Sequence, residues 1–132
     1  MAPWTHTYLN PQSERRICCA SRETATWQKQ YIDRKGDTQS DYAPESLDSF
    51  WNGDKMKSVR RRILAGEKIP ECQVCNDNIL NLYTYKDYFT KNLFPHKIDE
   101  AIQSTSSDGA TTMKVISFDY RISNLCTFKC RI

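Results

Sequence analysis

The sequence has little of what several common functional sites require. Only four glycines and two histidines occur among its 132 residues, and no glycine-rich loop of the kind that cradles phosphate is present. There is no Ser-His-Asp arrangement, EF-hand loop, internal repeat or low-complexity tract. A net charge of +3 is weak for a nucleic-acid-binding domain, which usually carries a denser basic stripe. We therefore do not expect nucleic acid as a partner.

Long apolar segments are also missing. No run approaches the length of a bilayer span, and the first residues lack the apolar stretch of a secretory signal peptide. We therefore expect a cytoplasmic chain with no membrane partner and with reduced thiols. Six cysteines in such a compartment favour metal binding over disulfides.

Strand patterns open the chain. Residues 4–9 and 15–20 predict the two strands of a hairpin, because both favour extended structure and turn-forming residues 10–13 separate them. This hairpin places Cys18 and Cys19 on or just beyond its second strand.

Two helices are predicted next. Ser46 is expected to cap the first, and Gly53 to end it in a left-handed conformation. Asp54 is expected to cap the second helix, and Gly66 to close it. The second helix carries an apolar stripe: Met56, Val59, Ile63 and Leu64. Its four basic residues predict a solvated face: Lys57, Arg60, Arg61 and Arg62.

The last third of the chain predicts helices and then a strand. Residues 86–94 and 95–103 are the candidate helices. Residues 104–111 are dense in Ser, Asp and Gly and predict a linker. Residues 113–120 predict a strand.

Cys72 and Cys75 form the firmest metal-binding pattern. Two intervening residues let both sulfurs reach one metal, and both zinc sites and iron–sulfur clusters use this spacing. Cys18 or Cys19 can complete the set if the hairpin packs against this loop. Neighbouring strand residues point to opposite faces, so we choose Cys18 as the ligand and place Cys19 in the core or beside the ligands. The spacing alone fits zinc at least as well as iron.

Cys126 and Cys130 form a second pair, which by itself is a weak signal. Residues 119–132, read as DYRISNLCTFKCRI, resemble the first barrel strand and cluster loop of radical S-adenosylmethionine enzymes. Those enzymes use Cys-x3-Cys-x2-Cys, and this sequence stops before the third cysteine.

The upstream part resembles a twitch or SPASM-type auxiliary cluster module. The pieces that carry the resemblance are Pro3-Trp4, Asn10-Pro11, Cys18-Cys19-Ala20, residues 47–56, residues 60–66, and Pro70-x-Cys72-x2-Cys75. The resemblance implies an α+β fold with a hairpin-plus-helices module at 2–103, a linker at 104–111, and the first strand of a truncated (β/α) partial barrel at 112–132.

Cofactors follow from the same resemblance. It implies that Cys126 and Cys130 are two ligands of a [4Fe-4S] cluster that binds S-adenosyl-L-methionine and cleaves it reductively to a 5′-deoxyadenosyl radical. It also implies that Cys18, Cys72 and Cys75 hold an auxiliary [4Fe-4S] cluster. Three candidates for its fourth ligand stay open: Cys19, a residue beyond Ile132, or substrate. No catalytic residue is assignable, and this chain alone is expected to be inactive.

The family often modifies peptides or proteins, so the resemblance implies a substrate of that class and an electron donor such as flavodoxin or ferredoxin. The alternative is a non-enzymatic zinc-binding module for protein or nucleic-acid contact. If the truncation is real, residues 113–120 should lack the parallel neighbours of a complete barrel, since parallel pairing needs crossover connections.

Overall fold

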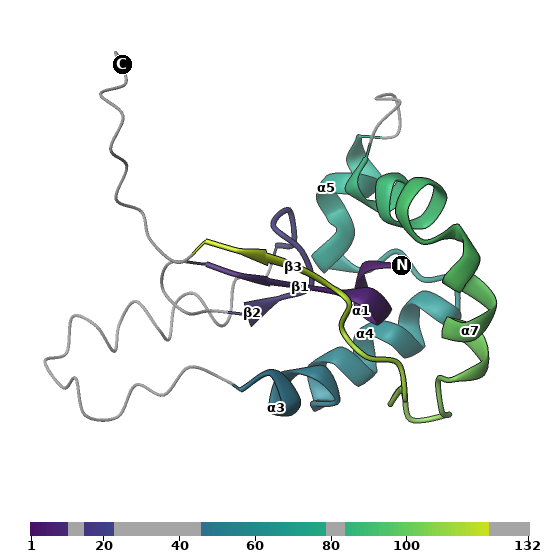
Figure 1. Ribbon diagram of the computed structural model, residues 1–132. Helices are drawn as coiled ribbons and strands as arrows, with labels where there is room; N and C mark the ends of the chain where they lie inside the picture. The colour runs from purple at the N-terminus through teal and green to yellow at the C-terminus, as the bar shows by residue number, and fades with distance from the viewer. Residues whose placement is uncertain (11–14, 23–45, 79–83, 122–132) are drawn as a thin grey trace, which may run out of the picture.

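The computed structural model describes residues 1–10, 15–22, 46–78 and 84–121. It is mixed α+β, with one small sheet and several helices (Figure 1), which confirms the predicted class. The described elements are α1 (Ala2–Thr5), β1 (His6–Leu9), β2 (Arg15–Arg16), α3 (Leu47–Trp51), α4 (Asp54–Leu64), the 3₁₀ helix η1 (Pro70–Cys72), α5 (Gln73–Asp77), α6 (Tyr85–Asp87), the π-helix η2 (Tyr88–Leu93), the 3₁₀ helix η3 (Pro95–Lys97), α7 (Ile98–Gln103) and β3 (Ser117–Tyr120).

The sheet has the strand order β2-β1-β3. β1 runs antiparallel to β2, with Tyr8 opposite Arg16, and parallel to β3, with His6 opposite Ser117. The expectation that the last strand lacks a parallel neighbour is therefore wrong. The long connection through the helices supplies the crossover that a parallel pair needs. On its other edge, β3 has no partner strand in the part of the chain that the structure describes.

The N-terminal segment turns once before it becomes a strand. Ala2–Thr5 forms the helical turn α1, with Pro3 in its first turn, where the missing N–H of proline costs nothing. The Trp4 N–H and the Thr5 hydroxyl both donate to the Met1 carbonyl, each at 3.0 Å. The prediction of a strand from residue 4 is therefore wrong for its first two residues.

The two central helices form where the sequence predicts them, with one change at their junction. Ser46 caps α3, since its hydroxyl accepts the Ser49 N–H at 3.1 Å. Gly53 does not adopt the predicted left-handed conformation. Its φ is −69°, and it is itself the N-cap of α4, one residue before the predicted cap Asp54. Glycine suits this position because a β-carbon would lie 2.6 Å from the Ser49 carbonyl oxygen.

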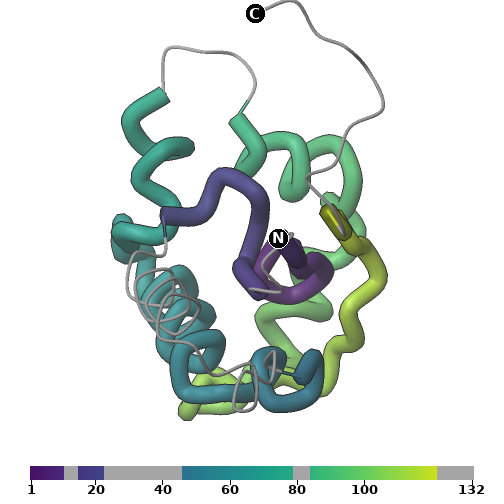
Figure 2. Tube along the Cα trace, turned by 90° about the vertical axis from the view of Figure 1, so that its left-hand side faces the viewer, coloured from purple at the N-terminus to yellow at the C-terminus, as the bar shows by residue number. Residues whose placement is uncertain are grey.

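At the other end of α4, Gly66 has φ +78° and follows the helix as predicted. The stripe of α4 packs into the main core with Met56 and Val59 buried, whereas Leu64 is exposed. The other buried members of that core are Ala2, Ile17, Phe50, Trp51, Ile69 and Phe89. Figure 2 shows the N-terminal segment at the centre of the molecule, with the helices arranged around it.

Arg60 contradicts the predicted solvated face of α4. Its side chain is 0% exposed and lies over the Trp51 ring, with the guanidinium carbon 4.6 Å from the ring centroid. The Arg60 guanidinium donates to the carbonyl oxygens of Pro3 at 2.8 Å and Gly109 at 3.4 Å, and to Asn52 Oδ1 at 3.1 Å. Three neutral oxygens and an aromatic face thus replace water around this cation.

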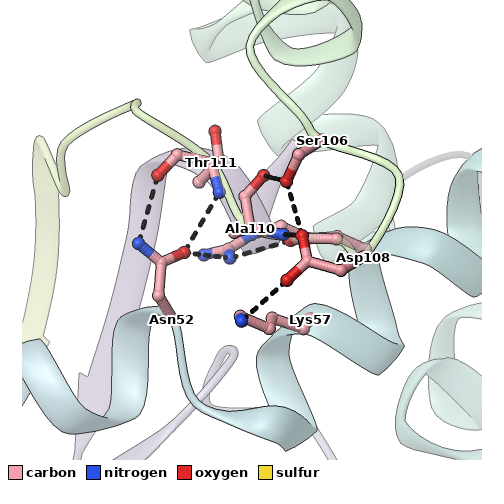
Figure 3. Close-up of polar contacts among 8 residues, drawn as sticks. Asn52, Lys57, Ser106, Asp108, Ala110 and Thr111 are labelled. Carbon is pink, nitrogen blue, oxygen red and sulfur yellow. Dashed lines mark hydrogen bonds and ion pairs between the residues drawn. The ribbon is translucent and has the colours of Figure 1, made fainter.

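Residues 104–111, predicted as a linker, fold back against α4 (Figure 3). Asn52 donates to the Thr111 carbonyl at 3.2 Å and accepts the Thr111 N–H at 3.1 Å, while Lys57 pairs with Asp108 at 2.8 Å. Gly109 is buried with φ +91°. We call this set the Arg60 network: Asn52, Lys57, Arg60, Asp108, Gly109 and Thr111. This network joins the helices to the segment before β3. The proposed division of the chain into domains stays a prediction.

Two indoles also hold the segment that leads to β3. Trp4 Nε1 donates to Thr105 Oγ1 and Trp51 Nε1 to the Met113 carbonyl, both at 2.8 Å. The helices predicted over 86–94 and 95–103 are present as α6 with η2 and as η3 with α7. Within the described residues, none of the helices combines the length and apolarity needed to cross a membrane.

Candidate functional site: a cysteine-lined cavity

Cys18 and Cys19 lie just after β2. Ile17 is buried and fixes the chain at the end of the strand, and the Ser21 N–H donates to the Cys18 carbonyl at 3.1 Å to close a turn. Both cysteines are therefore in a turn, where strand alternation does not govern their directions. Cys18 lines a cavity that Cys19 does not line, and the choice of Cys18 as the metal ligand stays a prediction.

Cys72 and Cys75 come from the loop that follows α4. Ile69 is buried and anchors this loop, and the Cys72 N–H donates to the Ile69 carbonyl at 3.1 Å. Pro70 begins η1, Cys72 ends it, and Cys75 lies within the short helix α5 that follows. Both cysteines line the same cavity as Cys18.

The two cysteine-bearing segments are in direct contact. The Arg22 N–H, beyond the turn that holds Cys18, donates to the Glu71 carbonyl at 3.3 Å. Cys18 and Cys72 also pack against the main core from the two sides of this contact. The condition set from the sequence, that the segment around Cys18 packs against the Cys72 loop, is therefore met.

The cavity has a volume of about 300 Å³ and mainly apolar walls. Helices α1, α4, η2 and α7 contribute to it, and representative wall residues are Trp4, Ile63, Phe89 and Ala101. Cys18, Cys72 and Cys75, which we call the cysteine cluster, supply its sulfur atoms.

Burial sets the protonation of these thiols. Burial raises the pKa of Cys18 to about 12, with smaller contributions from Cys19, Cys75 and Cys72 and against a backbone hydrogen bond at Ala20 that lowers it. The pKa of Cys72 is also raised, first by burial and then by Cys75. Lys86 and the Met1 amino group act in the opposite direction on the pKa of Cys72, but burial outweighs them. A metal ion bound between the thiols would favour their thiolate forms.

The donor set suits a thiophilic metal in its chemistry but is not arranged as a finished site. In residues 1–10, 15–22, 46–78 and 84–121, no three Cys, His, Asp or Glu side chains form a group able to hold a metal ion. Metal sites of this kind often take their final geometry only when the metal binds. Glu71 Oε2, beside Cys72, is buried and has no hydrogen-bond partner in the described part of the chain.

The remaining predicted residues fall into two groups. Cys126 and Cys130 lie outside the described residues. His6 on β1 contacts β3 and η2. Its Nδ1 lies 2.9 Å from Ser117 Oγ, and its ring lies 4.6 Å from that of Phe89.

Sequence reasoning missed Tyr85 and Lys86 as residues of this site, yet both line the cavity. No local signal indicates this role, because the other cavity walls come from distant parts of the chain. Comparisons with protein-family models, with curated proteins and with solved structures found no match, so the functional argument depends on this geometry.

Proposed function

We propose that this chain is the N-terminal part of a radical S-adenosylmethionine enzyme and that its cysteine cluster holds an auxiliary iron–sulfur cluster. The observation that carries the proposal is the meeting of Cys18 with Cys72 and Cys75 at one cavity. These residues come from segments about fifty positions apart in the sequence, and the Arg22–Glu71 hydrogen bond joins them. Unrelated structural cysteines have no reason to converge in this way.

In this proposal the chain's own residues hold and shield the auxiliary cluster. Cys18, Cys72 and Cys75 would be its thiolate ligands, and a bound [4Fe-4S] cluster supplies one-electron redox chemistry. Ile17 and Phe89 line the cavity beside the thiols and would exclude water, which influences the reduction potential of such a centre. Cys19, which does not line the cavity, is the weaker candidate for a fourth ligand.

The edge position of β3 supports the finer fold proposal, in which this strand begins a partial barrel. In the sequence, β3 precedes the proposed ligands Cys126 and Cys130 of the catalytic cluster, which would bind S-adenosylmethionine. Ile116, just before the strand, and Phe118 and Tyr120 within it are all exposed. Exposed apolar side chains on a sheet often mark a surface that other structure covers. A peptide or protein substrate and a flavodoxin or ferredoxin donor remain part of the proposal.

Anaerobic reconstitution with iron and sulfide tests the proposal. We expect a brown protein with broad absorbance near about 400 nm, as thiolate-ligated clusters show. The Cys126→Ser/Cys130→Ser variant should keep the auxiliary iron, and a further Cys72→Ser change should remove it. The matched control is Cys19→Ser in the same background, which should retain most of the iron.

A different metal would give a different result. If the chain purifies colourless with stoichiometric zinc and does not take up iron, the alternative of a zinc-binding module is the better account. Iron that stays bound after Cys18, Cys72 and Cys75 are all replaced by serine would also contradict the proposal, because the metal would then sit elsewhere.

A further inference from the structure

The cavity has room for more than a metal centre. Its volume of about 300 Å³ reaches the lower end of the range for small-molecule sites, roughly 300–1,000 Å³. Most of its wall away from the cysteines is apolar. A concave apolar site with few polar groups is the usual form of a ligand-binding pocket.

Exposed apolar side chains lie along the same cavity. Leu64 at the end of α4 is 43% exposed, and Ile98 and Ile102 on α7 are 36% and 54% exposed. Ile98 and Ile102 are four residues apart and thus share one face of the helix. Covering these side chains would stabilise a complex, since apolar surface leaves water.

Charge at the cavity is unbalanced. Glu67 and Lys86 are the charged side chains among the described lining residues. Glu67 is already paired with Arg62 at 2.8 Å. Lys86 has no ion pair with any described carboxylate, and its charge acts on the nearby Cys72. The Met1 amino group also lies at the cavity, but it donates to Thr90 Oγ1 at 3.0 Å, and burial lowers its pKa to about 6. Among the described lining residues, the cavity therefore offers an apolar body and the ammonium group of Lys86 as its cationic side chain.

We propose that this cavity binds an apolar ligand that carries one carboxylate, such as a medium-chain alkyl carboxylate. The alkyl chain would fill the space between α4 and α7 and cover Ile102, and the carboxylate would pair with Lys86. The binding needs no metal. Its failure is therefore distinguishable from failure of the proposed cluster site.

Titration of the metal-free chain with octanoate, hexanoate and octanol, followed by calorimetry, tests this proposal. We expect saturable binding of octanoate about tenfold tighter than that of hexanoate, because two more methylene groups leave water. Octanol should bind more weakly than octanoate, since it offers no charge to Lys86.

Matched variants locate the site. Ile102→Glu should weaken octanoate binding at least tenfold. Ile116→Glu, at a residue of similar exposure (51%) that does not line the cavity, should leave it within about twofold. Lys86→Met should weaken octanoate a few-fold, as expected for an exposed ion pair, and leave octanol unchanged. The proposal is overturned by absence of saturable binding, by equal effects of the two glutamate variants, or by equal weakening of octanoate and octanol in Lys86→Met.

Discussion

The Arg60 network and the cysteine cluster both place polar groups inside the molecule, yet they differ in how completely those groups are satisfied. In the Arg60 network, Nε and Nη1 of the guanidinium reach three oxygens, and Nη2 is its unpartnered atom in the described part of the chain. In the cysteine cluster, burial favours neutral thiols, and the side chains form no finished ligand set among the described residues.

This difference helps to distinguish buried polar groups that stabilise the fold from buried polar groups that bind a ligand. Buried polar groups in proteins nearly always find partners within the chain, as Nε and Nη1 of Arg60 do. A group of thiols brought together without such partners is incomplete as it stands. The Arg60 network is therefore expected to contribute to stability, and for the cysteine cluster we propose ligand binding.

Arg60→Ala should give the largest stability effect. The change leaves the carbonyl oxygens of Pro3 and Gly109 without this donor and empties the space over Trp51. Asn52 Oδ1 loses one of its two donors and keeps the Thr111 N–H. We expect a loss of about 3–4 kcal/mol in the free energy of unfolding, measured by urea denaturation. Arg61→Ala, at an exposed neighbour, should change it by no more than about 0.5 kcal/mol. Equal losses in the two variants would contradict a structural role for the Arg60 network.

Gly109→Ala should have the next largest effect. Gly109 has φ +91°, and a β-carbon there would collide with the Lys57 carbonyl oxygen in α4. We expect a loss of about 2–3 kcal/mol from the clash and the left-handed backbone together. Gly66→Ala shares the positive φ but meets no atom within 4 Å, so it should cost only about 1 kcal/mol. Similar losses from both variants would show that the close packing of residues 104–111 on α4 is absent.

Cys72→Ser in the metal-free chain should have a smaller effect on the free energy of unfolding. This variant gives the clearest comparison between the Arg60 network and the cysteine cluster. Among the described residues, no hydrogen bond or finished ligand set depends on this half-buried thiol, so we expect a loss below about 1 kcal/mol. The same variant should lose the increase in melting temperature that metal binding gives the unmodified chain. A large loss in the free energy of unfolding without metal would show that Cys72 stabilises the fold instead.

His6 gives the smallest expected effect and a pH dependence. Burial lowers its pKa below the ordinary 6.5, against the opposing influence of Asp119 and Ser117. The unfolded chain therefore binds a proton in acid more readily than the folded chain, and stability falls as the pH drops below about 6.5 toward the folded pKa. The urea midpoint should decrease through this window. His6→Gln should reduce the dependence of the urea midpoint on pH, and His96→Gln, at an exposed residue, should not. The reverse result would contradict the assignment of this pH dependence to His6.

Local signals in the sequence predicted the helices well. Ser46 and Gly66 mark helix ends through chemistry that depends on adjacent residues, and both occupy the predicted positions. The role of Gly53 at the helix junction was predicted for the wrong reason. Glycine is required there by close approach to the Ser49 carbonyl and not by a left-handed conformation.

Arg60 shows a signal that was present but misread. It lies four residues after Met56 and three before Ile63, and thus on the same face as the apolar stripe. Grouping it with Arg61 and Arg62 by charge hid this position. A buried arginine also needs acceptors from distant segments, here Pro3 and Gly109, and no local pattern shows them.

The parallel pairing of β1 with β3 lies beyond local reasoning for a similar reason. It joins His6 to Ser117 across most of the chain, and the intervening helices decide whether the two strands meet. The cysteine cluster was easier to predict from the sequence, because the Cys72-x2-Cys75 spacing is local. Only the position of Cys18 beside this pair depends on the fold. The identity of the metal and the arrangement of Cys126 and Cys130 stay predictions.

The most direct test of the account asks which cysteines a bound metal protects. The chain is loaded anaerobically with iron and sulfide. It is then alkylated for a time that labels Cys18, Cys19, Cys72 and Cys75 in the metal-free control, and labelled peptides are identified by mass spectrometry. We predict that Cys18, Cys72 and Cys75 become protected together while Cys19 is still labelled. Protection of Cys72 and Cys75 with Cys18 labelled as in the control would contradict a shared metal centre.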